Sequence, residues 1–319
     1  MILLVVVEQA YTQTASTTVK VGVLKYGTVN WELDVLTSHE LDKKNGVNIE
    51  IVELGNKNAT TIALQGGEVN AIVSDWIWVS RQRAAGKTYT FFPYSNAVGG
   101  MLVRPDADIK SFADLKGKRL GIAGGPVDKN WLIYRAYIRK QFGFDPMDEA
   151  DTQFAAPPLL NELMMKGDLD AVITFWVFGA RLQAAGMRPM VSVPEILPEL
   201  GVDTSMPLLG WVFDEQWAEH NPAAVEGLIR STYAAKEILL ESDAEWTRLS
   251  SLIRPESEDE LHTIRDVWRA GVPGRFDDAD LEGAALIFSI LAEAGGKKLV
   301  GDSPVLAEGT FWRRSGVKP

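Results

Sequence analysis

The hydrophobic and polar positions of the chain repeat as two similar halves. The segments GEVNAIVSDWIWVSRQRAAGK (67–87) and GDLDAVITFWVFGARLQAAGM (167–187) align without a gap. Each begins with a glycine and an acidic residue, continues as a short apolar strand, turns at an aromatic corner and ends as a helix that closes on Ala-Ala-Gly. Gly86 and Gly186 stand where a helix end favours a residue that tolerates positive φ. The pattern indicates an internal duplication.

A second pair of segments supports the duplication. VKVGVLKYG (19–27) and GKRLGIAGG (117–125) both predict a strand that runs into a glycine-bearing turn. Each half then predicts three strands alternating with three helices, which is typical of a parallel α/β lobe. Ligands of such sheets lie beyond the carboxyl ends of the strands. We therefore expect a cleft between two lobes, lined by four loops: 26–31, 74–78, 124–130 and 174–178.

Two glycine-interrupted apolar strands are expected to join the lobes as a hinge. They are AVGGMLVRP (97–105) and MPLLGWVFDE (206–215). Beyond Asp214 the hydrophobic spacing is helical, and we expect these C-terminal helices to pack on the first lobe, with Trp217, Trp246 and Trp268 in packing positions. The predicted boundaries are 19–100 plus 211–319 for lobe 1 and 101–210 for lobe 2.

The N-terminal stretch MILLVVVEQAYTQTAS joins a short apolar run to small and polar residues. We interpret residues 1–18 as the remnant of a secretory signal peptide and a linker, with an ordinary first strand as the alternative. No later stretch has the run of about 18 uncharged apolar residues that a membrane span requires. We expect an exported protein in the periplasm or another extracytoplasmic space, either free or tethered by its N-terminus.

The amino-acid composition excludes several classes of partner and of catalytic or metal site. The net charge of −11 argues against a nucleic-acid partner, which needs clustered Lys and Arg. The absence of cysteine excludes disulfides, thiolate catalysis and Cys-ligated metal centres, and the three histidines lack metal-site spacing. We therefore expect no cofactor and no metal, a monomer, and a small organic solute as the partner.

Several segments resemble one family. IKSFADLKGKRLGIAGG, the repeated GDLDAVITFW, and VFDEQWAEHNPAAVEGLI are similar to solute-binding proteins of ABC importers in the nitrate/sulfonate/taurine and thiamine-pyrimidine-precursor group, called SsuA/THI5-like or NMT1-like. The resemblance runs from Val19 to at least Ile238. It implies a type II periplasmic-binding-protein fold whose two α/β lobes close on a small molecule and deliver it to a membrane ABC permease.

The resemblance also implies which positions touch the solute, and the sequence departs from the family at some of them. Where sulfonate and nitrate binders usually carry Ser or Thr at the helix-opening turn, this chain has Pro126, which lacks an N–H group, and Asp128, which would repel an anion. Aromatic faces and carboxylates together favour a cationic, zwitterionic or heteroaromatic nitrogen compound, with a sulfonate-type solute kept open. The expected ligand-binding residues are Asn30, Trp31, Asp75, Trp76, Gly100, Gly124, Gly125, Asp128, Phe175, Trp176 and Trp211.

Plainer structural roles compete with these assignments. Asp75 and Asp128 are also good helix caps. Glu32 fits a solvated first-turn position, and Lys129 fits a solvated basic residue near a helix end. Trp78 and Trp131 suit packing within a lobe. An enzyme on the same fold acting on a small heteroaromatic substrate is the alternative function, although none of the histidines falls on an expected cleft loop and we expect no catalysis.

Overall fold

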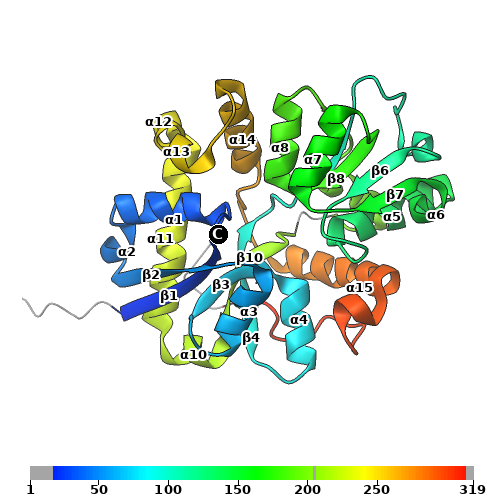
Figure 1. Ribbon diagram of the computed structural model, residues 1–319. Coiled ribbons are helices and arrows are strands. Elements are labelled where there is room, and N and C mark those ends of the chain that lie inside the picture. The colour runs from blue at the N-terminus through cyan, green and yellow to red at the C-terminus, as the bar shows by residue number, and fades with distance from the viewer. Residues whose placement is uncertain (1–16, 204–205, 314–319) are drawn as a thin grey trace, which may run out of the picture.

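The computed structural model describes residues 17–203 and 206–313 and consists of two α/β lobes (Figure 1). The first lobe is built around a five-stranded sheet of order β2-β1-β3-β10-β4. Its N-terminal elements are β1 (Thr17–Leu24), α1 (Val29–Ser38), α2 (Leu41–Lys44), β2 (Val47–Leu54), α3 (Lys57–Gln65), β3 (Ala71–Asp75), α4 (Trp76–Ala84) and β4 (Tyr89–Ser95).

The second lobe surrounds a five-stranded sheet of order β7-β6-β8-β5-β9. Its elements are β5 (Gly100–Val103), η1 (Phe112–Leu115), β6 (Arg119–Ile122), α5 (Lys129–Phe142), α6 (Pro146–Glu149), β7 (Asp151–Phe154), α7 (Pro157–Lys166), β8 (Ala171–Thr174), α8 (Trp176–Ala184), β9 (Arg188–Pro189), α9 (Val193–Ile196) and η2 (Pro198–Leu200).

The chain then returns to the first lobe and continues as helices. These last elements are β10 (Leu209–Asp214), α10 (Glu215–His220), α11 (Pro222–Glu241), α12 (Asp243–Arg248), α13 (Ser250–Ile253), α14 (Glu258–Ala270) and α15 (Asp278–Val300).

The duplication predicted from the sequence is confirmed in the topology. In the first lobe β1 pairs in parallel with both β2 and β3, and in the second lobe β6 pairs in parallel with both β7 and β8. The helices that follow β3 and β8 both end two residues before a glycine at positive φ, +81° at Gly86 and +89° at Gly186. Left-handed backbone is open to glycine at no steric cost, so both helices stop at the expected place.

The crossing strands, β5 and β10, stand where the chain passes between the lobes: it leaves the first sheet before β5 and returns to it at β10. Strand β10 enters the first sheet antiparallel to both β3 and β4, and β5 enters the second sheet antiparallel to β8. Gly99, just before β5, has φ +111°, and a Cβ built on it would lie 2.1 Å from the backbone oxygen of Thr174. Only glycine allows the chain to pass this close to the end of β8.

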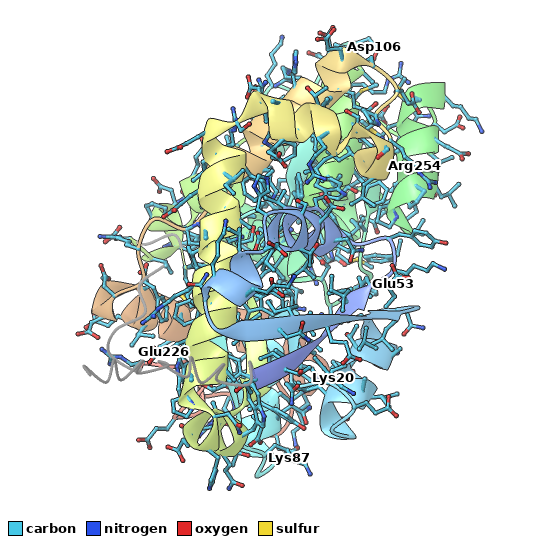
Figure 2. All side chains as sticks on the ribbon, turned by 90° about the vertical axis from the view of Figure 1, so that its left-hand side faces the viewer. Lys20, Glu53, Lys87, Asp106, Glu226 and Arg254 are labelled. Atoms are coloured by element: carbon cyan, nitrogen blue, oxygen red, sulfur yellow. The ribbon has the colours of Figure 1, made fainter. Side chains whose placement is uncertain are left out.

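The C-terminal helices cover the first lobe and also reach the second. Helix α11 packs against α1, β1 and β2, and Figure 2 shows it running along that side of the molecule. Helix α14 packs against α8, while α15 packs against both α4 and α5. The two lobes are therefore joined by packed helices as well as by the crossing strands.

The structure tests only part of what the sequence predicts for the N-terminus and for membrane-spanning helices. Strand β1 begins at Thr17, so the last two residues of the expected remnant and linker (1–18) belong to the first strand. The rest of that segment, residues 1–16, lies outside the described residues. Among the residues described, none of the helices has the length and apolar character to cross a membrane.

Candidate functional site

Asp75 is the centre of a charged cluster that joins the two lobes. It is the last residue of β3 and is only 4% exposed. Its Oδ1 accepts a hydrogen bond from the backbone N–H of Trp78 at 2.8 Å and so caps α4. Its Oδ2 accepts from Lys57 Nζ at 2.8 Å and from Lys129 Nζ at 2.9 Å. Lys57 begins α3 in the first lobe, whereas Lys129 begins α5 in the second. One carboxylate oxygen therefore accepts hydrogen bonds from both lobes.

The electrostatics of this cluster keep Asp75 ionised. Burial opposes the charged form, but the charges of Lys129 and Lys57 and their hydrogen bonds outweigh it and hold the pKa of the Asp75 carboxyl well below its usual range. The carboxylate in turn raises the pKa of Lys57. Lys129 is thus an ion-paired residue with its side chain 24% exposed, and the expectation of a solvated lysine is wrong. A cationic group arriving at Asp75 would have to compete with two ammonium groups.

The turn before α5 is shaped around Asp128. Its Oδ1 accepts from the backbone N–H of Trp131 at 3.1 Å, which confirms the capping role. Burial raises the pKa of its carboxyl. Gly124 and Gly125 have φ values of +81° and +87°, and a Cβ on Gly124 would lie 2.6 Å from Asp128 Oδ2. The two glycines let the turn fold back over the capping carboxylate. The Asp128 side chain therefore fills the turn in which related proteins are expected to bind an anion.

Two of the expected aromatic residues meet across the lobes. The rings of Trp31 in α1 and Trp176 at the start of α8 lie 5.8 Å apart at an interplanar angle of 84°. Phe175, next to Trp176, is 38% exposed. Trp31 also packs edge-on against Trp246, whose ring contacts Trp268, so the packing roles expected for those two are confirmed.

Other expected site residues lie inside the lobes. Trp76 is fully buried against Phe288 and Phe311, and Trp211 is fully buried against Tyr94. Trp211 belongs to the same hydrophobic cluster as Trp31 and Trp176, whereas Trp76 belongs to a different cluster. Contact of either ring with a solute stays a prediction. The packing roles of Trp78 and Trp131 are confirmed: Trp78 lies on Tyr89, and Trp131 is in the core.

Asn30 and Gly100 have backbone roles at the ends of strands. Asn30 Nδ2 donates to the carbonyl oxygens of Leu24 at 2.8 Å and Lys25 at 3.1 Å, which ties the start of α1 to the end of β1. Gly100 pairs with Thr174 at the start of β5. Both residues therefore help to position the loops of the expected cleft, and direct solute contact stays a prediction for each.

Three buried polar residues lie around this cluster, on loops that were expected to line the cleft, although they are not among the expected ligand-binding residues. Ser74 Oγ, Thr174 Oγ1 and Asn130 Oδ1 are buried and have no hydrogen-bond partner in the part of the chain that the structure describes. Contacts of adjacent residues place these three side chains near one another. Ser74 precedes Asp75, which binds Lys129, and Lys129 precedes Asn130. Asn130 Nδ2 donates to the carbonyl of Val98 at 3.1 Å. Val98 precedes Gly99, which abuts Thr174.

Ser74 and Thr174 occupy the same position in the two copies of the repeat, at the carboxyl ends of β3 and β8. The ungapped alignment of the two segments was the signal that could have identified them. Small hydroxyl residues at strand ends are common, however, and only the structure shows that both hydroxyl groups are buried and unpartnered.

The model of one protein family, NMT1/THI5 like, matches residues 42–245, which is more than half of the chain. The chain belongs to the NMT1/THI5-like family. No curated protein matches it by sequence.

Solved structures agree with this assignment at the level of the fold. The periplasmic aliphatic sulphonate binding protein SsuA from Escherichia coli superimposes with a TM-score of 0.72 at 19% identity, covering 93% of this chain and 97% of that one. The alkanesulfonate-binding protein SsuA from Xanthomonas axonopodis pv. citri, bound to MOPS, gives 0.68 at 16% identity and covers 93% and 99%.

An enzyme shares the architecture as well. The desulfurization enzyme DSZB superimposes with a TM-score of 0.58 at 16% identity, covering 92% of this chain and 97% of that one. The type II binding-protein fold expected from the sequence is therefore confirmed, and it is a fold that hosts both binding and catalysis.

A second ion pair in this NMT1/THI5-like chain lies deep in the first lobe. Glu32 in α1 binds Lys236 in α11, and both side chains are almost completely buried. Burial raises the pKa of Glu32 and lowers that of Lys236, while the attraction between them opposes both shifts. Lys236 Nζ also lies 3.7 Å from the ring centroid of Tyr94. The expectation that Glu32 is solvated is wrong, because α11 covers that face of α1.

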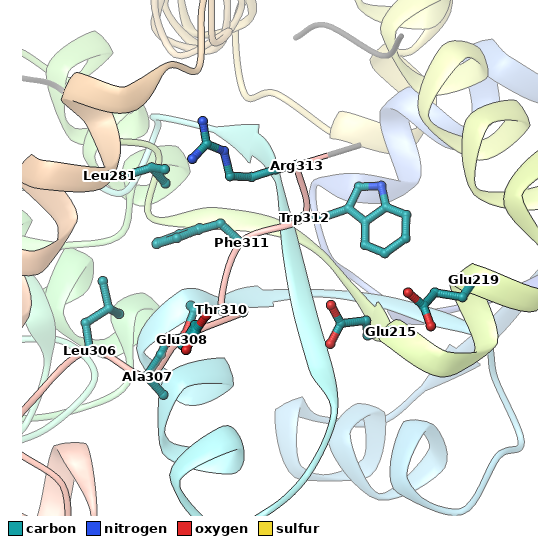
Figure 3. A pocket seen from close by; sticks show the side chains of 11 residues that line it. Glu215, Glu219, Leu281, Leu306, Ala307, Glu308, Thr310, Phe311, Trp312 and Arg313 are labelled. Atoms are coloured by element: carbon teal, nitrogen blue, oxygen red, sulfur yellow. Dashed lines mark hydrogen bonds between the residues drawn. The ribbon is translucent and has the colours of Figure 1, made fainter. Parts of the chain in front are cut away.

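A cavity of about 560 Å³ lies elsewhere, beside α10, α15 and segment 306–313 (Figure 3). None of the residues expected to bind solute lines it. Glu215 on its wall is bound by Arg83 at 3.0 Å. In the described ranges, no group of three His, Cys, Asp or Glu residues is arranged to hold a metal ion.

Proposed function

We propose that this protein is the extracytoplasmic solute-binding component of an ABC importer, which captures a small organic solute between its lobes and delivers it to a membrane permease. The observation that carries the proposal is the pair of buried, unpartnered hydroxyl groups of Ser74 and Thr174 at equivalent strand ends of the two lobes. Membership of the NMT1/THI5-like family and the fold shared with periplasmic sulfonate-binding proteins support it.

The physical argument rests on the cost of unmade hydrogen bonds. A buried polar group without a partner costs about 1–3 kcal/mol, and such groups in native proteins call for a reason, such as a bound ligand or ordered water. Ser74, Thr174 and Asn130 hold unpartnered atoms close to where the strands of both lobes end, which is where open α/β sheets bind ligands. A solute placed there would hydrogen-bond to both lobes and favour the closed arrangement.

The side chains around these atoms suit a solute with an apolar or flat part and a charged part. Trp31, Trp176 and the exposed Phe175 offer aromatic surface. Lys57 and Lys129 offer positive charge, and Asp75 offers an acceptor. Nitrogen heteroaromatics, zwitterions such as aminosulfonates, and sulfonates are the classes that fit.

A binding screen tests the proposal. Purified protein is examined by thermal shift against aminopyrimidines, simple amines, taurine, alkanesulfonates and MOPS, and each stabilising compound is titrated by calorimetry. A single tight ligand that raises the melting temperature with one-to-one stoichiometry is expected. Failure of every class to stabilise the protein or to release heat would contradict a solute-binding role.

Matched variants locate the site. Ser74→Ala and Thr174→Val are each expected to weaken binding of the screened ligand by about tenfold, the equivalent of one lost hydrogen bond of about 1.4 kcal/mol. Thr90→Val is the control, because Thr90 Oγ1 is likewise buried and unpartnered among the described residues but belongs to β4, away from the strand ends that face the other lobe. Equal losses in all three variants would contradict a localised site.

A catalytic role is the second candidate, favoured by the fold shared with the desulfurization enzyme DSZB. Mass spectrometry of each stabilising compound after prolonged incubation with the protein separates the two functions. Unchanged compounds are expected; a product formed by the wild type and not by Ser74→Ala would favour the enzyme.

A further inference from the structure

We propose that Asp75 is an internal counter-ion of the solute site: without solute it holds Lys129 across the lobes and keeps them together, and an entering anionic group takes Lys129 from it. This inference deepens the proposed function, on which its second half rests. In this proposal Lys129 exchanges one partner, Asp75, for another, the anionic group of the solute. Asp75 competes with that anionic group for Lys129 and so weakens anion binding.

The geometry of Asp75 supports a fixed partner and an exchangeable one. Oδ1 is committed to the backbone N–H of Trp78, so the carboxylate cannot rotate away without uncapping α4. Lys57 reaches Oδ2 from within the first lobe. Lys129 reaches the same oxygen from the second lobe, so only its bond must break when the lobes move apart.

Charge counting shows why the cluster favours an anion as the competitor. Asp75 carries one negative charge and binds two ammonium groups, which leaves this ion triad with an excess of positive charge. The nearby carboxyl of Asp128 caps α5 through Trp131 and also interacts with Lys57 and Lys129. Burial raises the pKa of this carboxyl, so it holds its negative charge less firmly than Asp75 does. An anionic solute group would bring the triad to neutrality, whereas a cationic group would add to the excess.

The position of Lys129 supports its role as the exchangeable partner. It stands beside Asn130, whose Oδ1 is buried without a partner among the described residues, and both belong to the first turn of α5. A solute N–H or O–H group that donates to Asn130 Oδ1 therefore brings the rest of the solute next to the Lys129 ammonium, which an anionic part of the same solute can bind. The side chain of Lys129 is 24% exposed, so the ammonium can be reached without unfolding of the helix.

The solute-free half of the proposal is tested by distances between the lobes. The chain has no cysteine, so spin labels can be attached cleanly at Glu53→Cys on β2 and at Met165→Cys on α7, two exposed positions in different lobes. Pulsed electron paramagnetic resonance then compares the label distances in four backgrounds: wild type, Asp75→Asn, Lys129→Met and Lys140→Met. Asparagine keeps the shape and the capping oxygen of Asp75, so this variant retains the helix start. Lys140 is the matched control, because it lies on the same helix but donates to Glu199 within the second lobe.

The expected result is a longer-distance population in Asp75→Asn and Lys129→Met that is absent from the wild type and from Lys140→Met. Distance distributions that are the same in all four proteins would overturn the proposal. This readout needs no solute, so it remains decisive even if the binding screen finds no ligand and the proposed function fails.

The exchange half is tested with methanesulfonate, a small anion without aromatic surface. Asp75→Asn is expected to bind it at least about fivefold more tightly than the wild type, because an internal competitor and a closed solute-free state have both been removed. Lys129→Met is expected to bind it at least about tenfold more weakly, the loss of one charge-assisted hydrogen bond. Equal or weaker binding by Asp75→Asn would overturn the competition between Asp75 and solute.

Discussion

Lys129 Nζ and Asp75 Oδ2 lie 2.9 Å apart although the two residues belong to different lobes. Asp75 ends a strand of the first sheet and caps the helix that follows, while Lys129 opens a helix of the second lobe. One residue therefore stabilises its own lobe and binds the other. Any change at Asp75 is expected to alter folding stability and the contact between lobes together.

The stability effect of Asp75→Asn should depend on pH. Because the pKa of Asp75 is lowered in the folded protein, its contribution is fully present above the pKa of the unfolded chain, about 4, and is lost as the pH falls towards the lowered value. We expect Asp75→Asn to reduce the free energy of unfolding by roughly 2 kcal/mol at pH 7, as for a charged hydrogen bond. The difference from the wild type should shrink below about pH 4. Urea unfolding across the pH range measures it, and a difference that does not vary with pH would refute the argument.

Removing Lys236 should leave a buried, unpaired carboxylate. We expect Lys236→Met to destabilise the protein by about 3–5 kcal/mol at pH 7, because Glu32 then has no counter-ion. Burial already raises the pKa of Glu32, so the stabilising protonated form is present at low pH and its contribution is lost as the pH rises through the raised pKa. The variant should therefore recover stability on acidification relative to the wild type.

A double variant checks this explanation. Glu32→Gln combined with Lys236→Met removes both charges, and it is expected to be more stable at pH 7 than Lys236→Met alone, since a neutral amide is cheaper to bury than an unpaired carboxylate. Chemical denaturation of the three proteins at one pH gives the comparison. If the double variant is as unstable as the single one, lost packing rather than buried charge is the cause.

Gly99 should tolerate no side chain. At φ +111°, with a Cβ only 2.1 Å from the Thr174 oxygen, Gly99→Ala adds a clash to backbone strain. We expect a loss of at least about 3 kcal/mol in unfolding free energy, the upper end of local backbone strain. Gly46→Ala is the matched control, because Gly46 has φ +76° and open space around it, and it should cost about 1 kcal/mol. Thermal unfolding compares them; equal losses would mean that the clash at Thr174 relaxes freely.

The contact between Trp31 and Trp176 should be measurable as a coupling between lobes. A double-mutant cycle with Trp31→Leu and Trp176→Leu is expected to give a coupling of about 0.5–1.5 kcal/mol, typical of an edge-on aromatic pair. A parallel cycle pairing Trp31→Leu with Trp217→Leu serves as the control, because Trp217 packs on Phe213 instead and its effect should add independently. No coupling in the first cycle would indicate that the two rings are not held together in solution.

Much of the fold followed from local pattern. The repeat from Gly67 and Gly167 predicted equivalent strands and helices, and both are found with the same parallel pairing in the two sheets. The capping alternative for Asp128 could be foreseen because an N-cap is a contact between neighbours in sequence. Such features need only a few consecutive residues and the backbone geometry that they favour.

The site was predicted less completely. Asp75 lies at the end of a strand as expected, and its role in solute binding stays a prediction. Its two lysine partners could not be foreseen, and Lys129 was expected to be solvated. Glu32 was expected to be exposed and is buried under Lys236. These errors share one cause: whether a charged side chain is paired or solvated depends on which distant segment packs over it.

The amino-acid order by itself determined the duplicated α/β units, their glycine-ended helices and the crossing strands, because hydrophobic periodicity and backbone preference act over short distances along the chain. Only the tertiary structure decided which charges meet and which polar atoms are left without partners. Glu32 and Lys236 are 204 positions apart and Asp75 and Lys129 are 54 apart. Their pairing follows from the docking of whole helices and lobes. Burial removes water from the charged groups, so each group depends on the protein partner that remains for its stabilisation.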